Sequence, residues 1–146
     1  DIRTEVHMPV VASVGLPFLI AELASREALR RCVPNLQGFR ATLPLDGAVS
    51  LYAYTLDSDS DAPCDVQARM FTPRMTEDPA TGSATAAVTA LLALHRDKTT
   101  LDLTVSQGVD MGRASVLFTG YDATSGKAVV RVGGKCIITL EGTFSL

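Results

Sequence analysis

Short apolar runs separated by glycine, proline, asparagine and aspartate make up most of this sequence, and the pattern predicts many strands and few helices. The first apolar region is interrupted at Gly15, which fits either two strands or one bent strand. Near the C-terminus, Gly133-Gly134 has the composition of a hairpin turn and joins the last two predicted strands. In chain order, the predicted strands cover residues 6–14, 17–23, 48–56, 66–71, 101–106, 115–121, 128–132 and 136–140, and those at 48–56 and 66–71 form a hairpin.

Two helices are predicted between these strands. Ser25 can cap a short helix over residues 26–31, which Pro34-Asn35 ends. A longer helix over residues 82–95 is apolar or small on nearly every face, a pattern typical of a helix surrounded by protein. Only a curved sheet can cover such a helix, so we expect an α+β fold in which an antiparallel, barrel-like β-sheet wraps around one central α-helix.

Composition narrows the class of protein. The chain has 146 residues, 47% hydrophobic and 20% charged, so residues 1–146 are expected to form a single domain with one core. A net charge of −3 provides no basic surface, which argues against a nucleic-acid partner. No apolar run reaches the length of a membrane span, so no membrane association is expected. Because the sequence starts at Asp1 and soon enters a strand pattern, we expect the chain to be part of something longer.

The cysteines indicate a compartment rather than a site. Cys32, Cys64 and Cys136 are odd in number, far apart, and lack the spacing of a zinc site or a disulfide framework. We interpret them as buried thiols in a reducing compartment and expect a cytoplasmic protein without a bound metal. Pro9 and Pro17 interrupt the apolar N-terminal segment, which therefore does not match a signal sequence.

The start of the long predicted helix concentrates polar chemistry. Asp78 precedes a turn rich in Gly, Ser and Thr, and a helix start carries unpaired N–H groups and a partial positive charge, which suits a small anionic ligand. A simpler interpretation is that Asp78, followed by Pro79, only caps the helix. The presence of three possible caps, Asp78, Thr81 and Ser83, around Gly82 favours a site, because a helix needs one cap.

Two other groups of polar residues have simpler interpretations. Residues 57–61 alternate Asp and Ser like the opening of an EF-hand calcium loop, but Ala62 and Ala68 replace the required Gly and Glu, so we interpret this segment as a solvated hairpin tip. His7 and His95 do not lie beside a cysteine or a serine motif, which disfavours a Ser or Cys hydrolase. His95 is favourable simply as a positive group at the end of a helix.

A glycine-rich turn lies between two of the later predicted strands. It contains Gln107-Gly108 and Gly112, and its simplest interpretation is a loop whose glycines adopt positive φ angles. Arg113 in this turn could pair with a carboxylate on a ligand or on the protein, and the sequence leaves both possibilities open.

Four motifs occur together and in a characteristic order: residues 77–84 (EDPATGSA), Gln107-Gly108, residues 111–115 (MGRAS) and residues 132–134 (VGG). In this combination the chain resembles the phenazine-biosynthesis PhzF-like family. That family belongs to the diaminopimelate epimerase-like fold, in which two similar domains each wrap an antiparallel sheet around a central helix, with the active site between them. The resemblance covers the whole of this chain but only the second domain of a family member.

The resemblance implies isomerase or epimerase chemistry without a metal or organic cofactor, in which a proton is moved on a small carboxylate-bearing substrate. It assigns Asp78 to the family's active-site aspartate, and Gly82 and Ser83 to positions that contact substrate. We expect Thr81, which lies beside them, to bind substrate as well. The family's principal acid–base glutamate and a further active-site histidine belong to the first domain. The expected partners are therefore the substrate, a first PhzF-like domain and a second copy of the chain in a homodimer.

The mechanism that follows gives Asp78 a positioning or electrostatic role. We hypothesise that Asp78 orients a substrate amine or a developing positive charge, while the N–H groups of Gly82 and Ser83 hold the substrate carboxylate. Two alternatives remain open. One is a non-catalytic small-molecule binding or assembly domain that retains the fold, and the other is a purely structural sheet around a helix that binds no ligand.

Overall fold

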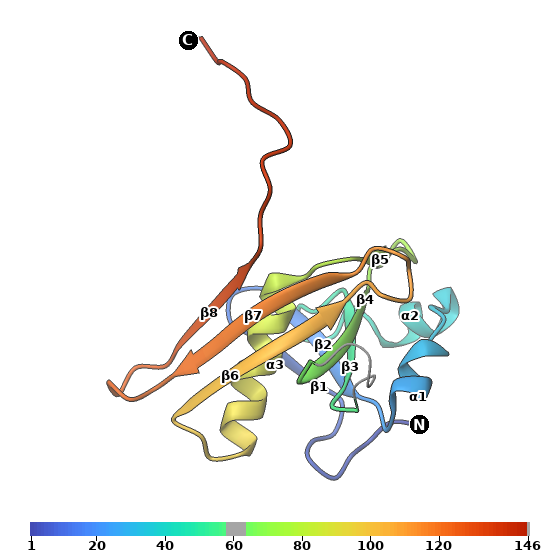
Figure 1. Cartoon of the computed structure of the whole chain (residues 1–146). Helices are drawn as coiled ribbons and strands as arrows, with labels where there is room; N and C mark the ends of the chain where they lie inside the picture. The colour runs from blue at the N-terminus through green and yellow to red at the C-terminus, as the bar shows by residue number, and fades with distance from the viewer. Residues whose placement is uncertain (58–63, 146) are drawn as a thin grey trace.

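In a computed structural model, which describes residues 1–57 and 64–145, the chain forms a curled mixed sheet packed against one long helix (Figure 1). Within these residues the sheet has eight strands in the order β1-β2-β3-β4-β6-β7-β8, with β5 paired to β4. The strands are β1 (Val10–Ser13), β2 (Pro17–Glu22), β3 (Leu51–Thr55), β4 (Val66–Phe71), β5 (Glu77–Asp78), β6 (Thr100–Gln107), β7 (Ser115–Asp122) and β8 (Val129–Gly134), and the helices are α1 (Arg26–Arg30), α2 (Leu36–Thr42) and α3 (Gly82–His95).

The sheet is not purely antiparallel, which corrects the sequence prediction. β2 runs parallel to β3, and β4 runs parallel to β6, whereas the other paired strands are antiparallel. Parallel neighbours need a crossover connection, and the chain supplies two. The segment with α1 and α2 joins β2 to β3, and the segment with β5 and α3 joins β4 to β6.

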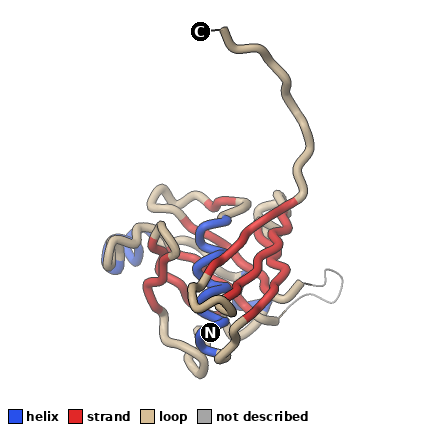
Figure 2. The backbone as a smooth tube through the Cα atoms, turned by 90° about the vertical axis from the view of Figure 1, so that its left-hand side faces the viewer, coloured by secondary structure: helices blue, strands red, loops and turns tan. Residues whose placement is uncertain are grey.

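Helix α3 lies inside the curl of this sheet. It contacts β1, β2, β6, β7 and β8, and because β1 and β8 are the opposite ends of the strand order, a flat sheet could not offer both to one helix. Figure 2 shows α3 running through the middle of the strands. The expected bounds of this helix and its burial are both confirmed. The main core joins Phe18, Ile20, Tyr52, Tyr54, Val66, Ala68, Met70, Leu103, Val105 and Leu117 of the strands to Ala84, Ala87, Val88 and Leu92 of α3.

Three local predictions in the first half of the chain are confirmed. β1 and β2 are separate antiparallel strands joined through Gly15, whose φ of +148° lies outside the usual range of other residues, so the alternative of one bent strand is wrong. Ser25 caps α1 by accepting a hydrogen bond of 3.1 Å from the Ala28 N–H. The predicted hairpin over residues 48–56 and 66–71 corresponds to the antiparallel pair β3 and β4.

Helix α2 and strand β5 are absent from the sequence prediction. Asn35 ends the loop after α1, but its side chain also accepts a hydrogen bond of 2.8 Å from the Gly38 N–H and so starts α2. Pro34-Asn35 was predicted only to end a helix, whereas Asn35 also starts the next one. β5 has two residues, too few for an alternating pattern, and forms because Met70 and Phe71 of β4 pair with it.

The last predicted strand, residues 136–140, and the turn at Gly133-Gly134 are wrong. β8 continues through both glycines, which pair with Phe118 and Leu117 of β7. The turn before β8 joins it to β7, and there the Gly126 N–H bonds to the Ala123 carbonyl oxygen at 3.1 Å. β7 is eight residues long, and β8 stays paired with it as far as Gly134. Residues 135–145 extend away from the body without regular structure (Figure 1).

The predictions for the cysteines, for residues 57–61 and for a membrane-spanning segment have different outcomes. Cys32 and Cys64 are half-buried, but Cys136 is exposed, so its interpretation as a buried thiol is wrong. Residues 58–63 lie outside the described residues, which leaves the proposed hairpin tip at 57–61 untested beyond Asp57. Asp57 itself accepts a hydrogen bond of 2.9 Å from the Arg26 N–H. Within the described ranges, no helix is long and apolar enough to cross a membrane.

Candidate functional site

Asp78 is held beside the first turn of α3. It is the second residue of β5, where it pairs with Met70, and three residues separate it from Gly82 at the start of the helix. Asp78 is half-buried, Thr81 is buried, Gly82 is half-buried and Ser83 is exposed. The structure therefore brings the four predicted site residues together and leaves the outer part of the group open to solvent.

A hydrogen-bond network ties these residues to Gln107. The Gln107 amide oxygen accepts from the Thr81 N–H at 3.1 Å. Its amide nitrogen donates to the Asp78 carbonyl oxygen at 2.7 Å and to Thr81 Oγ1 at 2.8 Å. Thr81 Oγ1 in turn donates to Asp78 Oδ2 at 2.7 Å. Gln107 thus holds the backbone carbonyl of Asp78, and Thr81 holds its carboxylate.

None of the three predicted caps satisfies the helix start. Thr81 occupies the N-cap position, but its side chain accepts no hydrogen bond from the first turn of α3. Within the described residues, the backbone N–H groups of Gly82, Ser83 and Ala84 have no hydrogen-bond partner. The helix start therefore presents free donors and a partial positive charge next to the Asp78 carboxylate. This arrangement can hold a small anion, the property that the sequence predicted from redundant caps.

The glycine-rich turn packs directly against the Asp78 loop. Gly108 has a φ of +79°, and a Cβ at this position would lie 2.9 Å from the Pro79 carbonyl oxygen and would also meet the Arg113 carbonyl oxygen. Glycine is required here both for its φ angle and for this close approach. Gly112 also has a positive φ, of +76°, which confirms the simple interpretation of the turn. The side chain of Arg113 is exposed.

Buried ion pairs brace the elements that carry Asp78. Arg69 of β4 binds Glu77 of β5 through two hydrogen bonds, 3.0 Å from Nε and 2.7 Å from Nη2. Hydrogen bonding to Glu77 raises the pKa of the Arg69 guanidinium, while burial acts in the opposite direction. In the glycine-rich turn, Asp110 receives two hydrogen bonds of 2.9 and 2.7 Å from Arg26 of α1. Arg69 Nη1 also donates to the carbonyl oxygens of Leu29, Arg30 and Cys32.

A second polar cluster lies at the opposite end of α3. The ring of His7 stacks on that of His95, the last residue of α3, with 5.7 Å between their centroids. His7 Nε2 is 2.7 Å from the Tyr54 hydroxyl, which donates to the buried Glu22 at 3.2 Å. Burial, followed by the charge of Glu22, raises the pKa of Tyr54. Nothing in the sequence pattern pairs the two histidines, and this cluster is separated from Asp78 by the length of the helix.

Two hollows bear on ligand binding. One, of about 620 Å³, is lined by Ala80, Ser115, Gly133 and Lys135 among others and borders the Asp78 loop. It falls within the size range of small-molecule sites.

Among the described residues, no group of three or more His, Cys, Asp or Glu side chains could hold a metal ion.

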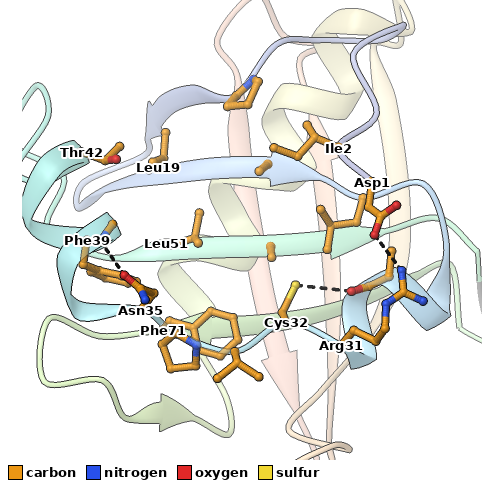
Figure 3. Close-up of a pocket in the computed structure, with 18 of the residues that line it drawn as sticks. Asp1, Ile2, Leu19, Arg31, Cys32, Asn35, Phe39, Thr42, Leu51 and Phe71 are labelled. Atoms are coloured by element: carbon orange, nitrogen blue, oxygen red, sulfur yellow. Dashed lines mark hydrogen bonds and ion pairs between the residues drawn. The ribbon is translucent and has the colours of Figure 1, made fainter.

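The other hollow, of about 710 Å³, lies on the outer face of the sheet under α1 and α2 (Figure 3). Its floor includes Leu19 and Leu51, which alternate along their strands with the residues that face α3. It contains Cys32, whose thiol has a pKa raised by burial, with Arg69 opposing this effect. Since none of the predicted site residues lines it, this hollow is separate from the Asp78 site.

Gln107 is the residue of this site whose role the sequence did not reveal. In the sequence, Gln107 stands out only as part of a turn and of a family motif. A signal was present, because Leu103, Val105 and Gln107 alternate on one face of β6 and the first two belong to the core. A polar side chain that continues an apolar alternation must be hydrogen-bonded when buried, and Gln107 is fully buried.

Comparison with known proteins agrees with this description of the fold. The model of the family described as phenazine biosynthesis-like protein (PhzC-PhzF) matches residues 2–142. The chain belongs to this family.

Among curated relatives, the chain is similar to antisense-enhancing sequence 1 of Schizosaccharomyces pombe, with 26% identity over 95% of this chain and 47% of that protein. It is also similar to an uncharacterised isomerase of Mesorhizobium japonicum, with 30% identity over 97% of this chain and 49% of that protein. The chain thus spans about half the length of the curated relatives it matches.

Solved structures show the same fold. A PhzF-family phenazine biosynthesis protein of Bacillus anthracis superposes with a TM-score of 0.73 at 22% identity, covering 84% of this chain and 43% of that one. A predicted epimerase of Pseudomonas aeruginosa gives a TM-score of 0.54 at 31% identity, covering 84% of this chain and 40% of that one. Of these relatives, the Mesorhizobium japonicum protein is described as an isomerase and the Pseudomonas aeruginosa protein as a predicted epimerase.

Proposed function

We propose that this chain supplies one half of the active site of a PhzF-like isomerase that moves a proton on a small carboxylate-bearing metabolite without a cofactor. By motif order, it corresponds to the second of the two domains of a family member. The complementary half would come from a first PhzF-like domain, and we further propose that the complete protein is a cytoplasmic homodimer. The observation that carries the proposal is the fixed Asp78 carboxylate beside the free N–H groups of Gly82 and Ser83.

The proposed division of labour follows from charge. The N–H groups at the start of α3 would bind the substrate carboxylate, because they carry partial positive charge and have no partner in the described part of the chain. Asp78 would orient the substrate amine or a positive charge that develops during the reaction. The groups that donate and accept the proton would belong to the other half.

A non-catalytic role is the second candidate. Within the described residues, the side chain of Asp78 bonds only to Thr81, and no acid–base side chain is hydrogen-bonded to it. A domain of this kind would bind a small amino or hydroxy acid without exchanging its protons.

Deuterium exchange distinguishes these candidates. The incorporation of solvent deuterium at the α-carbon of small amino and hydroxy acids would be measured with this chain alone and with the chain joined to a first PhzF-like domain. We expect exchange only in the second case, and we expect Asp78→Asn there to reduce it by about 10- to 100-fold, the effect of losing a charged hydrogen bond. Unchanged turnover in Asp78→Asn would remove Asp78 from the mechanism, and binding without exchange would favour the second candidate.

A further inference from the structure

Gln107 uses every polar atom of its side chain on the segment that carries Asp78. Its amide oxygen and nitrogen together contact the Asp78 carbonyl, the Thr81 N–H and the Thr81 hydroxyl. The side chain is fully buried, so water cannot replace these partners. Gly108, the next residue, allows the two backbones to approach at Pro79.

The direction of the hydrogen bonds is determined by chemistry. An amide N–H₂ group can only donate, so Thr81 Oγ1 accepts from Gln107 Nε2. The hydroxyl has a single proton, and its other neighbour is a carboxylate oxygen, which accepts when ionised. The Thr81 proton is therefore directed at Asp78 Oδ2, and the Gln107 amide determines that direction.

The same network determines which carboxylate oxygen is available. Asp78 Oδ2 is occupied by Thr81, whereas Oδ1 makes no hydrogen bond within the described part of the chain. Every buried side-chain oxygen and nitrogen there has a partner. Oδ1 must therefore be reached by solvent. It belongs to a half-buried residue, Asp78, that lies next to the free N–H groups of α3.

We infer that Gln107 is a positioning residue for Asp78: acting through the Thr81 hydroxyl, it fixes one carboxylate oxygen and presents the other, Oδ1, to the ligand. This inference rests on the proposed function in so far as the ligand is a small carboxylate bound at the start of α3. The positioning itself is a property of this chain alone. It assigns to the Gln-Gly pair a role that a simple loop would not have.

The first test measures the orientation of Asp78 without any substrate. Three-bond Hα–Hβ couplings report whether the χ1 angle of Asp78 holds one rotamer or averages over several. We expect one rotamer in the wild-type chain and in Thr81→Ser, which keeps the hydroxyl. We expect averaging in Thr81→Val, which has the same shape without the hydroxyl, and in Gln107→Glu, which cannot donate once ionised.

A matched control separates positioning from loss of a buried hydroxyl. Thr89, on the same helix, is fully buried and donates to the Thr85 carbonyl oxygen at 2.8 Å, away from Asp78. Thr89→Val should leave the Asp78 couplings unchanged. If Gln107→Glu fails to fold, the comparison of Thr81→Val with Thr81→Ser still decides. A single Asp78 rotamer in folded Thr81→Val would overturn the inference.

The second test follows turnover with the chain joined to a first PhzF-like domain. We expect Thr81→Val to lower kcat for deuterium incorporation by roughly 10- to 100-fold with KM little changed, and Thr81→Ser to restore most of it. Equal kcat values for Thr81→Val and the wild type would overturn the inference. Absence of exchange in the wild type would instead refute the proposed function, and the rotamer measurement would still decide the role of Gln107.

Discussion

Replacing Gly108 by alanine should destabilise the protein more than the same change at Gly126. Both glycines have nearly the same left-handed conformation, with φ of +79° and +81°, so alanine costs about 1–2 kcal/mol of backbone strain at each position. They differ in space. A Cβ at Gly126 meets nothing within 4 Å, whereas at Gly108 it meets the Pro79 carbonyl oxygen at 2.9 Å and the Pro79 Cα at 3.0 Å. These are backbone atoms, which cannot rotate away.

The additional cost at Gly108 is that of overpacking, about 1–3 kcal/mol. With a urea m-value of about 2 kcal/mol/M, Gly108→Ala should lower the unfolding midpoint by roughly 0.5–1.5 M more than Gly126→Ala does. Urea denaturation of the wild type and both variants measures this difference. Equal midpoints would refute the reasoning, because they would show that the contact between Gly108 and Pro79 does not constrain the fold.

The remaining predictions concern charge and thiol chemistry. Arg69→Met should lower the free energy of unfolding by about 3–5 kcal/mol because it leaves the Glu77 carboxylate, with only 10% of its side chain exposed, without its partner. Arg69→Lys should recover only part of this loss, since an ammonium group cannot make the paired hydrogen bonds; denaturant unfolding measures both, and a loss below about 1 kcal/mol in Arg69→Met would contradict the assignment. Burial raises the pKa of the Cys32 thiol, so its contribution to stability is complete below its ordinary value of 9.0 and is lost as the pH rises through the folded-state value. Between pH 7 and pH 10, the free energy of unfolding should therefore decrease less in Cys32→Ala than in the wild type. An equal decrease in the two proteins would argue against this burial effect. At pH 8 the exposed Cys136 should be alkylated before Cys32, as peptide mapping by mass spectrometry would show.

Elements with a strong local pattern were predictable from the sequence. α3 occupies the expected residues because its small and apolar side chains extend over almost every face, and β4 occupies the expected residues 66–71. The direction of neighbouring strands was not predictable in this way. Periodicity shows that a strand exists, but the parallel pair of β2 with β3 depends on how α1 and α2 cross the sheet.

Two errors have a shared physical origin in strand pairing. Gly133-Gly134 has the composition of a turn, but the backbone of both residues pairs with β7, and that long-range contact overrides local preference. The same pairing leaves residues 136–140 beyond the end of the sheet. Near the candidate site, α3 starts at Gly82 as the sequence predicted, but the sequence could not show that Gln107, 26 residues beyond Thr81, would bond to Thr81.

The extended segment after β8 has a practical consequence for work with this chain. Ile137, Ile138, Leu140 and Phe144 are 85–93% exposed, and the segment contains no proline. Such segments, rich in β-forming side chains and low in charge, readily stack into intermolecular strands. Purified material should therefore become prone to precipitation as its concentration rises, and a charged replacement at Leu140 would be the first change to make before any titration at high concentration.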